Sequence, residues 1–195
     1  ATGTQFLQAV GCALSRKLEN NKEIVYVSAG EGTTSQGDFH EALNWASNAK
    51  APVIFHIQDN EYAISTHKSV QNADSVYSMS MGYRNLSRYE VDGVDFFETN
   101  LAFKEATERA RKGKGPSLIV SNVIRLLPHS SSDDQKKYRT EEDLLKDQKR
   151  DPIILLKNQC LKQKIITLKQ FKNIEFKLKE KIENDVKWSL AQNDP

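Results

Sequence analysis

The sequence predicts an α/β fold, in which a parallel sheet carries helices on both faces and is followed by C-terminal helices. Short apolar runs of strand length alternate with segments of helical periodicity up to residue 124, and such alternation is typical of parallel sheets. The first two apolar runs each end at glycine or polar residues. With 195 residues, of which 38% are hydrophobic, the chain can bury a core without disulfides.

The first part of the chain is expected to form one strand, crossover and strand unit. The expected elements are a helix at 4–20, a strand at 23–29, a helix at 36–49 and a strand at 52–58, with a loop continuing to about residue 68. Phe39 and Trp45 are expected to pack the crossover helix onto the sheet. His56 lies within a strand and is interpreted as a packed core residue.

The second part repeats the alternation and then changes character. The expected elements are a short helix at 73–82, a strand at 88–91, a helix at 99–112 and a strand at 117–124. From Thr140 the sequence is rich in lysine and glutamate, and Asp151-Pro152 marks the break or start of a helix. We therefore expect an α/β core at 1–139, with its own N-terminal part missing, and a helical extension at 140–195.

The last helix is expected at about 168–191 and carries one apolar stripe suited to packing. The stripe residues recur at three- and four-residue steps: Phe171, Ile174, Leu178, Ile182, Val186 and Leu190. A solvated face is the default interpretation of the lysines beside this stripe, and a contact with a partner subunit is the alternative.

Two oxygen-bearing side chains follow the first two expected strands. Glu31 stands where the first strand ends, and Asn60 stands where the second ends. Parallel strands end at the same edge of a sheet, where ligands bind in such folds, so we expect these side chains to converge on one crevice. Carboxylate and amide oxygens suit Mg²⁺, which often shares its ligands with a substrate phosphate.

The turn after the first strand could itself face a phosphate. Gly30 and Gly32 allow a close approach to the backbone, and a helix is expected to start near Ser35, with Asp38 completing a capping-box-like pair. A purely structural turn is the alternative, because a carboxylate at a helix start also stabilises the helix dipole. The glycine spacing is not that of a dinucleotide-binding loop, and no Gly-Lys-Ser/Thr follows.

The stretch from Ile24 to Thr66 closely resembles the thiamine diphosphate signature, Gly-Asp-Gly followed by Asn-Asn, as it occurs in alpha subunits of 2-oxoacid dehydrogenases. The strings GDFHEALNWAS, APVIF and YAIST carry the resemblance, and Gly-Glu-Gly with YAIST is similar to the branched-chain type. The resemblance implies that Glu31, Asn60 and the backbone carbonyl of Tyr62 bind Mg²⁺. The residues implied to bind the cofactor are Gly30, Glu31, Gly32, Thr33, Asn60, Tyr62, Ile64, Arg125 and His129.

Two positions depart from the family pattern. Asp59 stands where the first asparagine is usual, and Glu61 stands where glycine is usual. An added pair of carboxylates near a bound diphosphate is electrostatically unfavourable unless the carboxylates are turned away from it.

A second block that resembles the family begins at Arg125 and reads RLLPHSSSDD, followed by Tyr138 and Arg139. Without the family it would be interpreted as a polar, solvated loop. The resemblance implies that His129 contributes to the active site, that Arg125 lies near the cofactor and that Ser130 is a possible phosphorylation site. A histidine can exchange protons near neutral pH, and a phosphate on Ser130 would repel an anionic substrate.

The opening residues, from Gly3 to Gly11, resemble a third family block, and Thr4 and Gln5 are implied to support a cation or cofactor site. Family alpha subunits have a long segment before this helix, so we expect the chain to be a fragment. The implied reaction is decarboxylation of a 2-oxoacid with thiamine diphosphate and Mg²⁺, followed by acyl transfer to a lipoyl group. The implied partners are a beta subunit or fused beta domain, which supplies the glutamate that activates the cofactor, and a lipoyl-bearing transacylase.

Several alternatives stay open at this stage. The substrate could be pyruvate, the fragment could be non-catalytic, or the chain could be a nucleotide-binding oxidoreductase domain. The chain alone is expected to be inactive. The 28 basic and 26 acidic residues give a net charge of +2, which is no footprint for nucleic acid. The spacing of Cys12 and Cys160 favours a reduced compartment, and no segment suits a membrane span. A bacterial cytoplasm or a mitochondrial matrix is expected.

Overall fold

The computed structural model describes residues 2–193. The chain forms two compact units, the first ending at Pro152 and the second beginning at Ile153. Each unit is described by itself.

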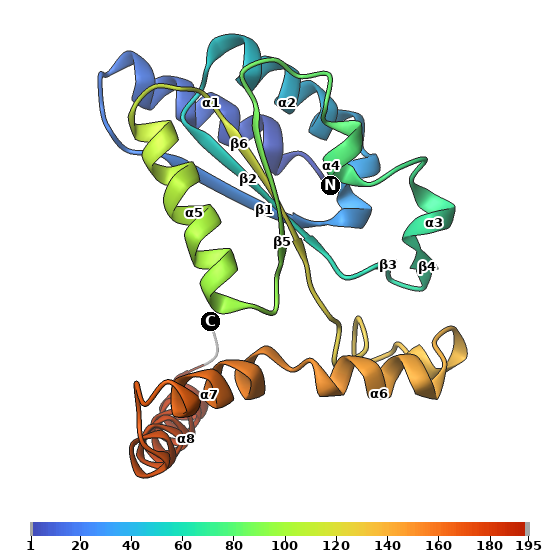
Figure 1. The fold of residues 1–195 in the computed structure, drawn as a ribbon, viewed down its shortest axis with the longest axis vertical. Coiled ribbons are helices and arrows are strands. Elements are labelled where there is room, and N and C mark those ends of the chain that lie inside the picture. Colours follow the sequence, from blue (N-terminus) through green and yellow to red (C-terminus); the bar gives the residue numbers. More distant parts are fainter. Residues whose placement is uncertain (1, 194–195) are drawn as a thin grey trace. The chain divides into compact units, whose positions relative to one another are not determined.

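A four-stranded parallel sheet is the centre of the first unit (Figure 1). Its strands, in spatial order, are β1 (Val25–Gly30), β2 (Val53–Asp59), β6 (Ser117–Asn122) and β5 (Ser87–Asp92). In the register of the sheet, Gly30 lies opposite Gln58, and Asp59 lies opposite Asn122. All four strands therefore end at one edge, as the expected parallel sheet requires.

Helices cover both faces of this sheet, as the sequence predicts (Figure 1). Helices α1 (Gln5–Leu18) and α2 (Gly37–Ala49) lie on one face, and α5 (Phe96–Arg111) lies on the other. The larger apolar cluster joins α1 and α2 to the β2 side chains of odd number, such as Phe55. The smaller cluster joins Ile54 to Ala106 of α5. This division follows from the strand, in which successive side chains point to opposite faces.

Three phenylalanines pack α1 and α2 onto the sheet. The ring centroids of Phe6 and Phe39 are 5.0 Å apart, and those of Phe6 and Phe55 are 6.2 Å apart. The expectation that Phe39 packs α2 onto the sheet is confirmed, because this side chain is only 2% exposed. The same expectation for Trp45 is wrong, because its side chain is 43% exposed. Trp45 is two residues from the buried Leu43, which places it on the outer side of the helix.

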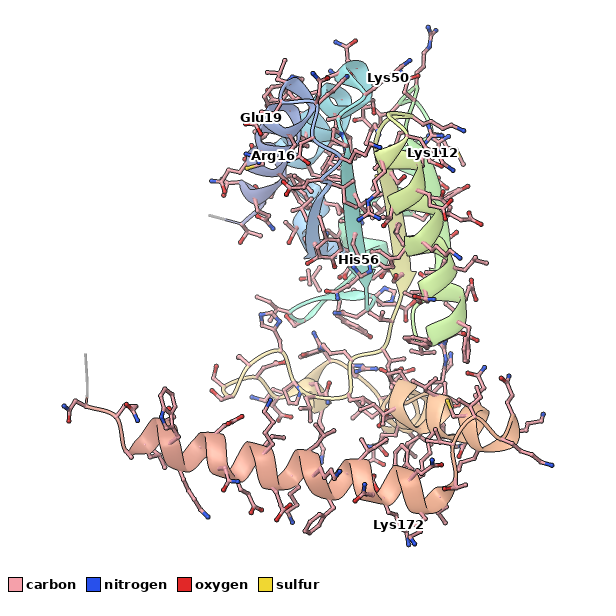
Figure 2. All side chains as sticks on the ribbon, turned by 90° about the vertical axis from the view of Figure 1, so that its left-hand side faces the viewer. Arg16, Glu19, Lys50, His56, Lys112 and Lys172 are labelled. Atoms are coloured by element: carbon pink, nitrogen blue, oxygen red, sulfur yellow. The ribbon has the colours of Figure 1, made fainter. Side chains whose placement is uncertain are left out.

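His56 is a packed core residue of β2, as the sequence predicts (Figure 2). Its Nδ1 lies 2.8 Å from the Tyr26 hydroxyl, and its Nε2 lies 2.9 Å from Oγ of Ser121. The ring also meets Phe103 edge-on, with 5.0 Å between centroids. Burial lowers the pKa of His56, so the neutral imidazole with both nitrogens hydrogen-bonded is the form that the core favours.

The segment after β2 differs from the expected loop and helix. A two-residue hairpin, β3 (Tyr62–Ala63) with β4 (Thr66–His67), is followed by one-turn helices α3 (Lys68–Gln71) and α4 (Val76–Met79). The short helix expected at 73–82 is confirmed only for the one turn of α4, and α3 lies before that range. Local caps set where each turn starts, since the His67 side chain accepts a hydrogen bond from the Ser69 amide and that of Ser75 from the Ser78 amide.

The first unit continues past the expected boundary at residue 139. After a short turn, η2 (Gln135–Lys137), helix α6 (Glu141–Lys149) starts at a capping box made by Thr140 and Asp143. Asp147 of this helix forms a salt bridge of 2.6 Å with the buried Arg139. These contacts tie α6 to the loop after the sheet, and the compact unit ends at Pro152.

The second unit contains α7 (Pro152–Lys162), apart from its first residue, and α8 (Leu168–Leu190). Pro152 is the first residue of α7, where proline is tolerated because that amide has no helical partner. The ammonium of Lys157 lies 4.3 Å from the centroid of the Phe171 ring. The expected apolar stripe is present on α8, but its members are largely exposed within the unit, for example Leu178 at 54%. Figure 2 shows Lys172 projecting from the same helix. Among residues 2–193 no helix combines the length and the apolar character needed to cross a membrane.

Candidate active site

Glu31 and Asn60 lie together at the carboxyl edge of the sheet. Glu31 directly follows β1 and begins a 3-10 turn, η1 (Glu31–Ser35), while Asn60 directly follows β2. The backbone amide of Asn60 donates a hydrogen bond of 3.3 Å to Oε2 of Glu31. The other carboxylate oxygen, Oε1, is buried and has no hydrogen-bond partner within residues 2–193. The structure thus places the Glu31 carboxylate against the backbone of Asn60 and leaves one buried carboxylate oxygen without a partner among these residues.

The environment of Glu31 disfavours its charged form. The side chain is 1% exposed. Burial raises the pKa of Glu31, and the nearby Asp59 raises it further, whereas two backbone hydrogen bonds and the ammonium of Lys68 lower it. A buried carboxylate with an unpaired oxygen costs free energy unless a cation or donor completes its shell. A bound divalent cation would supply that missing partner.

The remaining donors suit a hard cation. Oδ1 of Asn60 accepts a hydrogen bond of 3.0 Å from the Tyr62 amide, which folds the loop between these two residues into a tight turn. Asn60 therefore holds its amide oxygen inside the same turn that carries the Tyr62 carbonyl. No group of three His, Cys, Asp or Glu side chains in the described part of the chain could hold a metal. One carboxylate with amide, carbonyl and phosphate oxygens is the donor set that fits Mg²⁺ here.

The glycine turn has a packing role that the sequence did not predict. A Cβ on Gly32 would lie 2.6 Å from Cβ of Ala63, so this glycine lets the 61–64 loop close onto η1. A Cβ on Gly30 would meet only the Gln58 carbonyl oxygen, at 3.9 Å. Thr33 lies within the same turn, beside Gly3 at the chain's start.

The helix expected at 36–49 is confirmed, but the capping pair expected from Ser35 and Asp38 is wrong. Helix α2 begins at Gly37 after Gln36, whose side chain makes no capping hydrogen bond. The Thr34 hydroxyl donates 2.6 Å to the Glu31 carbonyl oxygen and closes the 3-10 turn instead. This local side-chain bond competes with a helical cap and delays the helix.

Asp59 and Glu61, the two acidic departures from the family pattern, both pair with the ammonium of Lys68. Oδ2 of Asp59 lies 3.1 Å from Nζ of Lys68, and Oε1 of Glu61 lies 3.4 Å from the same nitrogen. Asp59 is 5% exposed, and its other oxygen accepts 2.9 Å from the Glu61 amide. Burial alone would lower the pKa of Lys68, but the bonds to Asp59 and Glu61 outweigh it and raise that pKa. Lys68 is therefore held as an ammonium.

Arg125 joins the second family-like block to the turn that contains Tyr62. Its Nη1 donates 2.7 Å to the Ile64 carbonyl oxygen, and its Nη2 donates 2.6 Å to the Tyr138 hydroxyl. The guanidinium carbon lies 5.4 Å from the centroid of the Tyr62 ring. Ile64 has φ +57, a conformation that costs energy for a β-branched residue. The hydrogen bond from Arg125 helps to hold this strained residue at the site.

The loop of His129 and Ser130 is anchored through its backbone. The His129 amide donates 2.9 Å to Oδ2 of Asp133, which also accepts 2.6 Å from the Tyr138 hydroxyl. These hydrogen bonds, first from Tyr138 and then from His129, lower the pKa of Asp133. The side chains of His129 and Ser130 are exposed. Hydrogen bonds thus connect the His129 backbone to Asp133, Asp133 to Tyr138, and Tyr138 to Arg125. The catalytic role of His129 stays a prediction.

Several residues that shape this region were not predicted as site residues. Arg139 is 8% exposed and donates 2.9 Å to the Arg125 carbonyl oxygen, and its guanidinium lies 5.3 Å from the Tyr62 ring. Asp147 joins from α6, accepting from Arg139 at 2.6 Å. A signal exists for Tyr138 and Arg139, which follow the His129 block directly. None exists for Lys68 or Asp147, because only the folded chain brings them near.

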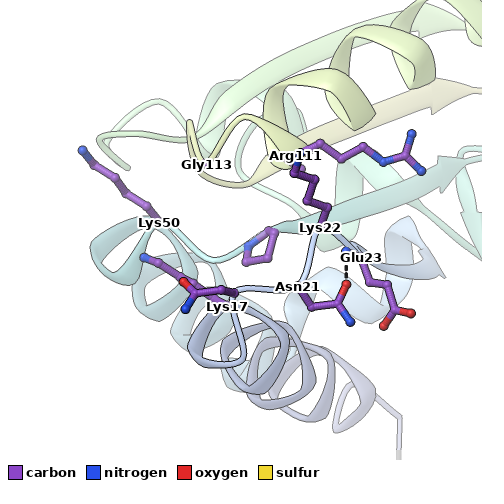
Figure 3. A pocket seen from close by; sticks show the side chains of 10 residues that line it. Lys17, Asn21, Lys22, Glu23, Lys50, Arg111 and Gly113 are labelled. Atoms are coloured by element: carbon purple, nitrogen blue, oxygen red, sulfur yellow. Dashed lines mark hydrogen bonds between the residues drawn. The ribbon is translucent and has the colours of Figure 1, made fainter.

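A pocket of about 210 Å³ with a basic lining lies away from this site (Figure 3). It lies at the opposite, amino-terminal edge of the sheet and is lined by Lys17, Lys22, Lys50 and Arg111 among others. Figure 3 shows the end groups of Lys50 and Arg111 pointing away from one another. Lys17 and Arg111 stand in the last turns of their helices, where cations stabilise the helix dipole. This pocket therefore needs no ligand to explain its charge.

Comparisons with known proteins agree with the geometry. A family model described as "Dehydrogenase E1 component" matches residues 1–195. The 2-oxoisovalerate dehydrogenase subunit alpha of Bacillus subtilis is 43% identical over 152 residues, which cover 77% of this chain and 46% of that protein. The pyruvate dehydrogenase E1 component subunit alpha of Staphylococcus aureus is 39% identical over 153 residues, or 78% of this chain and 41% of that protein. Its counterpart in Bacillus cereus is 35% identical over 193 residues, or 98% and 51%. The chain spans about half the length of the curated relatives it matches.

Proposed function

This chain belongs to the dehydrogenase E1 component family, and we propose that it is part of the alpha subunit of a thiamine diphosphate-dependent 2-oxoacid dehydrogenase. The reaction is the oxidative decarboxylation of a 2-oxoacid with transfer of the acyl group to a lipoyl group. The observation that carries the proposal is the contact between Glu31 and Asn60, beside a buried Glu31 oxygen without a partner. At this place the family-like signature, the sheet edge and a buried carboxylate oxygen without a partner in the described part of the chain coincide.

Residues of η1 and of the loop after β2 would hold the metal and the diphosphate. Glu31, Asn60 and the Tyr62 carbonyl would bind Mg²⁺, a cation that prefers oxygen ligands. Gly30, Gly32 and Thr33 would lie along the diphosphate. Thiamine diphosphate, when bound, supplies the carbanion chemistry that a protein side chain lacks. The chain's own contribution is to fix the cation and orient the cofactor.

The second block would work at the reacting end. Arg125 is held against the Ile64 carbonyl oxygen and Tyr138, so its guanidinium is pre-positioned and needs little further ordering on binding. The exposed His129 imidazole would exchange a proton with the bound substrate, because imidazole is the side chain that most readily takes up and releases a proton near neutral pH. The hydroxyl of Ser130 is exposed and open to a kinase. A phosphate there would add about two negative charges beside an anionic substrate.

The branched-chain substrate class is favoured over pyruvate. The 43% identity to the 2-oxoisovalerate dehydrogenase subunit and the Gly-Glu-Gly with YAIST support this preference. The relatives named for pyruvate, at 39% and 35%, make pyruvate the second candidate. Rates with 2-oxoisovalerate and pyruvate, compared as kcat/KM in the assembled complex, decide between the two. A ratio in favour of pyruvate would overturn the branched-chain preference.

The proposed partners are a beta subunit or fused beta domain, and a lipoyl-bearing transacylase. The beta partner would complete the cofactor site and supply the glutamate that activates the cofactor. The exposed stripe of α8, with its flanking lysines, is available for such a contact. The proposed location is the bacterial cytoplasm, as suggested by the bacterial relatives, with the mitochondrial matrix as the alternative.

Calorimetric titration tests the cofactor proposal. The complete protein, assembled with its beta partner, is titrated with thiamine diphosphate in the presence and absence of Mg²⁺, and separately with NAD. We expect Mg²⁺-dependent heat with thiamine diphosphate and none with NAD. Binding of NAD alone would support a nucleotide-binding oxidoreductase domain. A folded protein that binds neither ligand would support a non-catalytic member of the family.

A further inference from the structure

The acidic cluster beside Asn60 sets an electrostatic problem for the proposed cofactor. Asp59 and Glu61 flank this proposed metal ligand directly in the sequence. Both are carboxylates, and the proposed ligand brings a diphosphate to the same turn. Like charges brought to contact distance in a protein repel more strongly than they would in water, because the effective dielectric constant is lower. The turn therefore needs either a counter-charge or carboxylates that point away.

Lys68 supplies the counter-charge for these two carboxylates. Its ammonium lies 3.1 Å from the Asp59 carboxylate and 3.4 Å from that of Glu61, so one cation holds both acids. The Lys68 backbone amide also donates 2.8 Å to the Glu61 carbonyl oxygen. The lysine is thus fixed to the turn by its main chain as well as its side chain. Lys68, Asp59 and His67 line a cavity of about 310 Å³.

The β3–β4 hairpin brings this lysine into place. Tyr62 pairs with His67 in the hairpin, so the chain reverses and the residue after His67 returns to the turn that it left. Asp59 is 5% exposed, whereas the Lys68 side chain is 34% exposed. Removing the lysine would leave the Asp59 carboxylate buried without its cation.

We propose that Lys68 is a positioning residue of the cofactor site, which neutralises Asp59 and Glu61 and turns them away so that a diphosphate and its metal can bind beside Asn60. The inference rests on the proposed function and extends it, because the family signature contains neither acid. Lys68 acts through these two carboxylates and is not required to touch the cofactor. The acidic residues and the lysine form one compensated unit with a net charge of −1.

A purely structural ion pair is the competing explanation. Such a pair would affect the stability of the free protein and leave cofactor affinity unchanged. An electrostatic role predicts that affinity follows the net charge of the cluster. Lys68→Met changes that charge from −1 to −2 while keeping most of the side-chain length. Lys68→Met combined with Asp59→Asn returns it to −1 without any lysine.

The test measures the dissociation constant of thiamine diphosphate at fixed Mg²⁺ by titration calorimetry in the complete protein with its beta partner. For Lys68→Met we expect binding roughly tenfold to hundredfold weaker. The Lys68→Met/Asp59→Asn double variant should return to within about threefold of the wild type. Lys68→Arg, which keeps the charge, should also bind nearly as the wild type does. Lys22→Met, the same substitution at the far edge of the sheet, is the matched control and should bind like the wild type.

The outcomes separate the two proposals. Wild-type affinity in Lys68→Met, or a loss that Asp59→Asn does not recover, would overturn the role of Lys68 while the cofactor assignment stands. Absence of Mg²⁺-dependent binding in the wild-type protein would overturn the proposed function itself. Circular dichroism of each variant identifies any that fail to fold, and the double variant and Lys68→Arg then decide the question.

Discussion

Glu31 combines burial, charge and an unpaired oxygen, a combination that destabilises the free protein and favours a bound cation. The side chain is 1% exposed, and Oε1 has no partner among the residues that the structure describes. A group of this kind is a typical compromise at a functional site, where stability is given up for a pre-formed ligand. Its substitution should therefore have opposite effects on the free and the bound protein.

We predict that Glu31→Gln stabilises the free protein at pH 7 and weakens Mg²⁺-dependent binding of thiamine diphosphate at least about a hundredfold. The neutral amide has a smaller desolvation cost than the carboxylate but is a poor metal ligand. Thermal unfolding without ligand and calorimetry with ligand measure the two effects. Glu90→Gln, an exposed carboxylate of β5, is the matched control and should change neither. A free protein destabilised by Glu31→Gln would contradict the burial argument.

The same residue gives a pH dependence of defined sign. Burial raises the pKa of Glu31 above its ordinary value of 4.5, so between that value and the raised pKa the folded state binds more protons than the unfolded state. The stabilisation that protonation provides is full below pH 4.5 and is lost as the pH rises through the raised pKa. The difference in unfolding free energy between Glu31→Gln and the wild type should grow over that window. Unfolding curves collected from pH 4.5 to 8 measure it, and a difference that shrinks with rising pH would contradict the sign.

At the level of elements, the closure of the 61–64 loop onto η1 depends on one glycine. A Cβ at Gly32 would lie 2.6 Å from Cβ of Ala63 and 3.3 Å from its Cα, too close for either to stay in place. The turn carries Glu31 and the loop carries the Tyr62 carbonyl. Their contact therefore sets the spacing between the proposed metal ligands.

We predict that Gly32→Ala destabilises the protein by about 1–3 kcal/mol and weakens cofactor binding, because the loop must shift away from η1. Gly37→Ala is the matched control. A Cβ at Gly37 meets nothing within 4 Å, and alanine suits the start of α2, so a change within about 1 kcal/mol in the stabilising direction is expected. Chemical denaturation and calorimetry measure both effects. Equal stability of the two variants would show that the loop does not rest on Gly32.

The connecting elements show how local bonds override a periodic pattern. The residues at 73–82 predict a longer helix than the one turn of α4, which Ser75 starts by accepting a hydrogen bond from the Ser78 amide. His67 starts α3 in the same way, by accepting from the Ser69 amide. Helix α3 therefore begins at Lys68 directly after the hairpin, which returns this residue to Asp59 and Glu61.

At the scale of the whole molecule, the proposed function assigns the metal-binding side of the site to this chain and the rest of the site to a beta partner. We predict no decarboxylase turnover from the purified chain without a beta partner, and turnover when the partner is added. The physical reason is that, in the proposed function, the group that activates the cofactor comes from the beta partner. Decarboxylation of 2-oxoisovalerate, followed with an artificial electron acceptor, measures this. Turnover by the chain alone would contradict the prediction, and a partner-dependent rate lost in Glu31→Gln would tie the activity to this site.

The sequence by itself determined the order of the main strands and helices, the parallel sheet and the convergence of Glu31 with Asn60. These features follow from local information, because apolar periodicity selects strand or helix, and parallel strands must end at a common edge. The family resemblance of the same residues agrees with the match to the dehydrogenase E1 component family.

Only the tertiary structure decided the rest. Lys68 pairs with Asp59 and Glu61 because a hairpin brings it back to them. Arg125 binds Ile64 and Tyr138, and Asp147 attaches α6 to Arg139. All these contacts join residues that are separated along the chain. The exposure of Trp45 depended likewise on which side of α2 met the sheet. Such contacts depend on where side chains lie after packing, because neither periodicity nor spacing records the path of a loop in space.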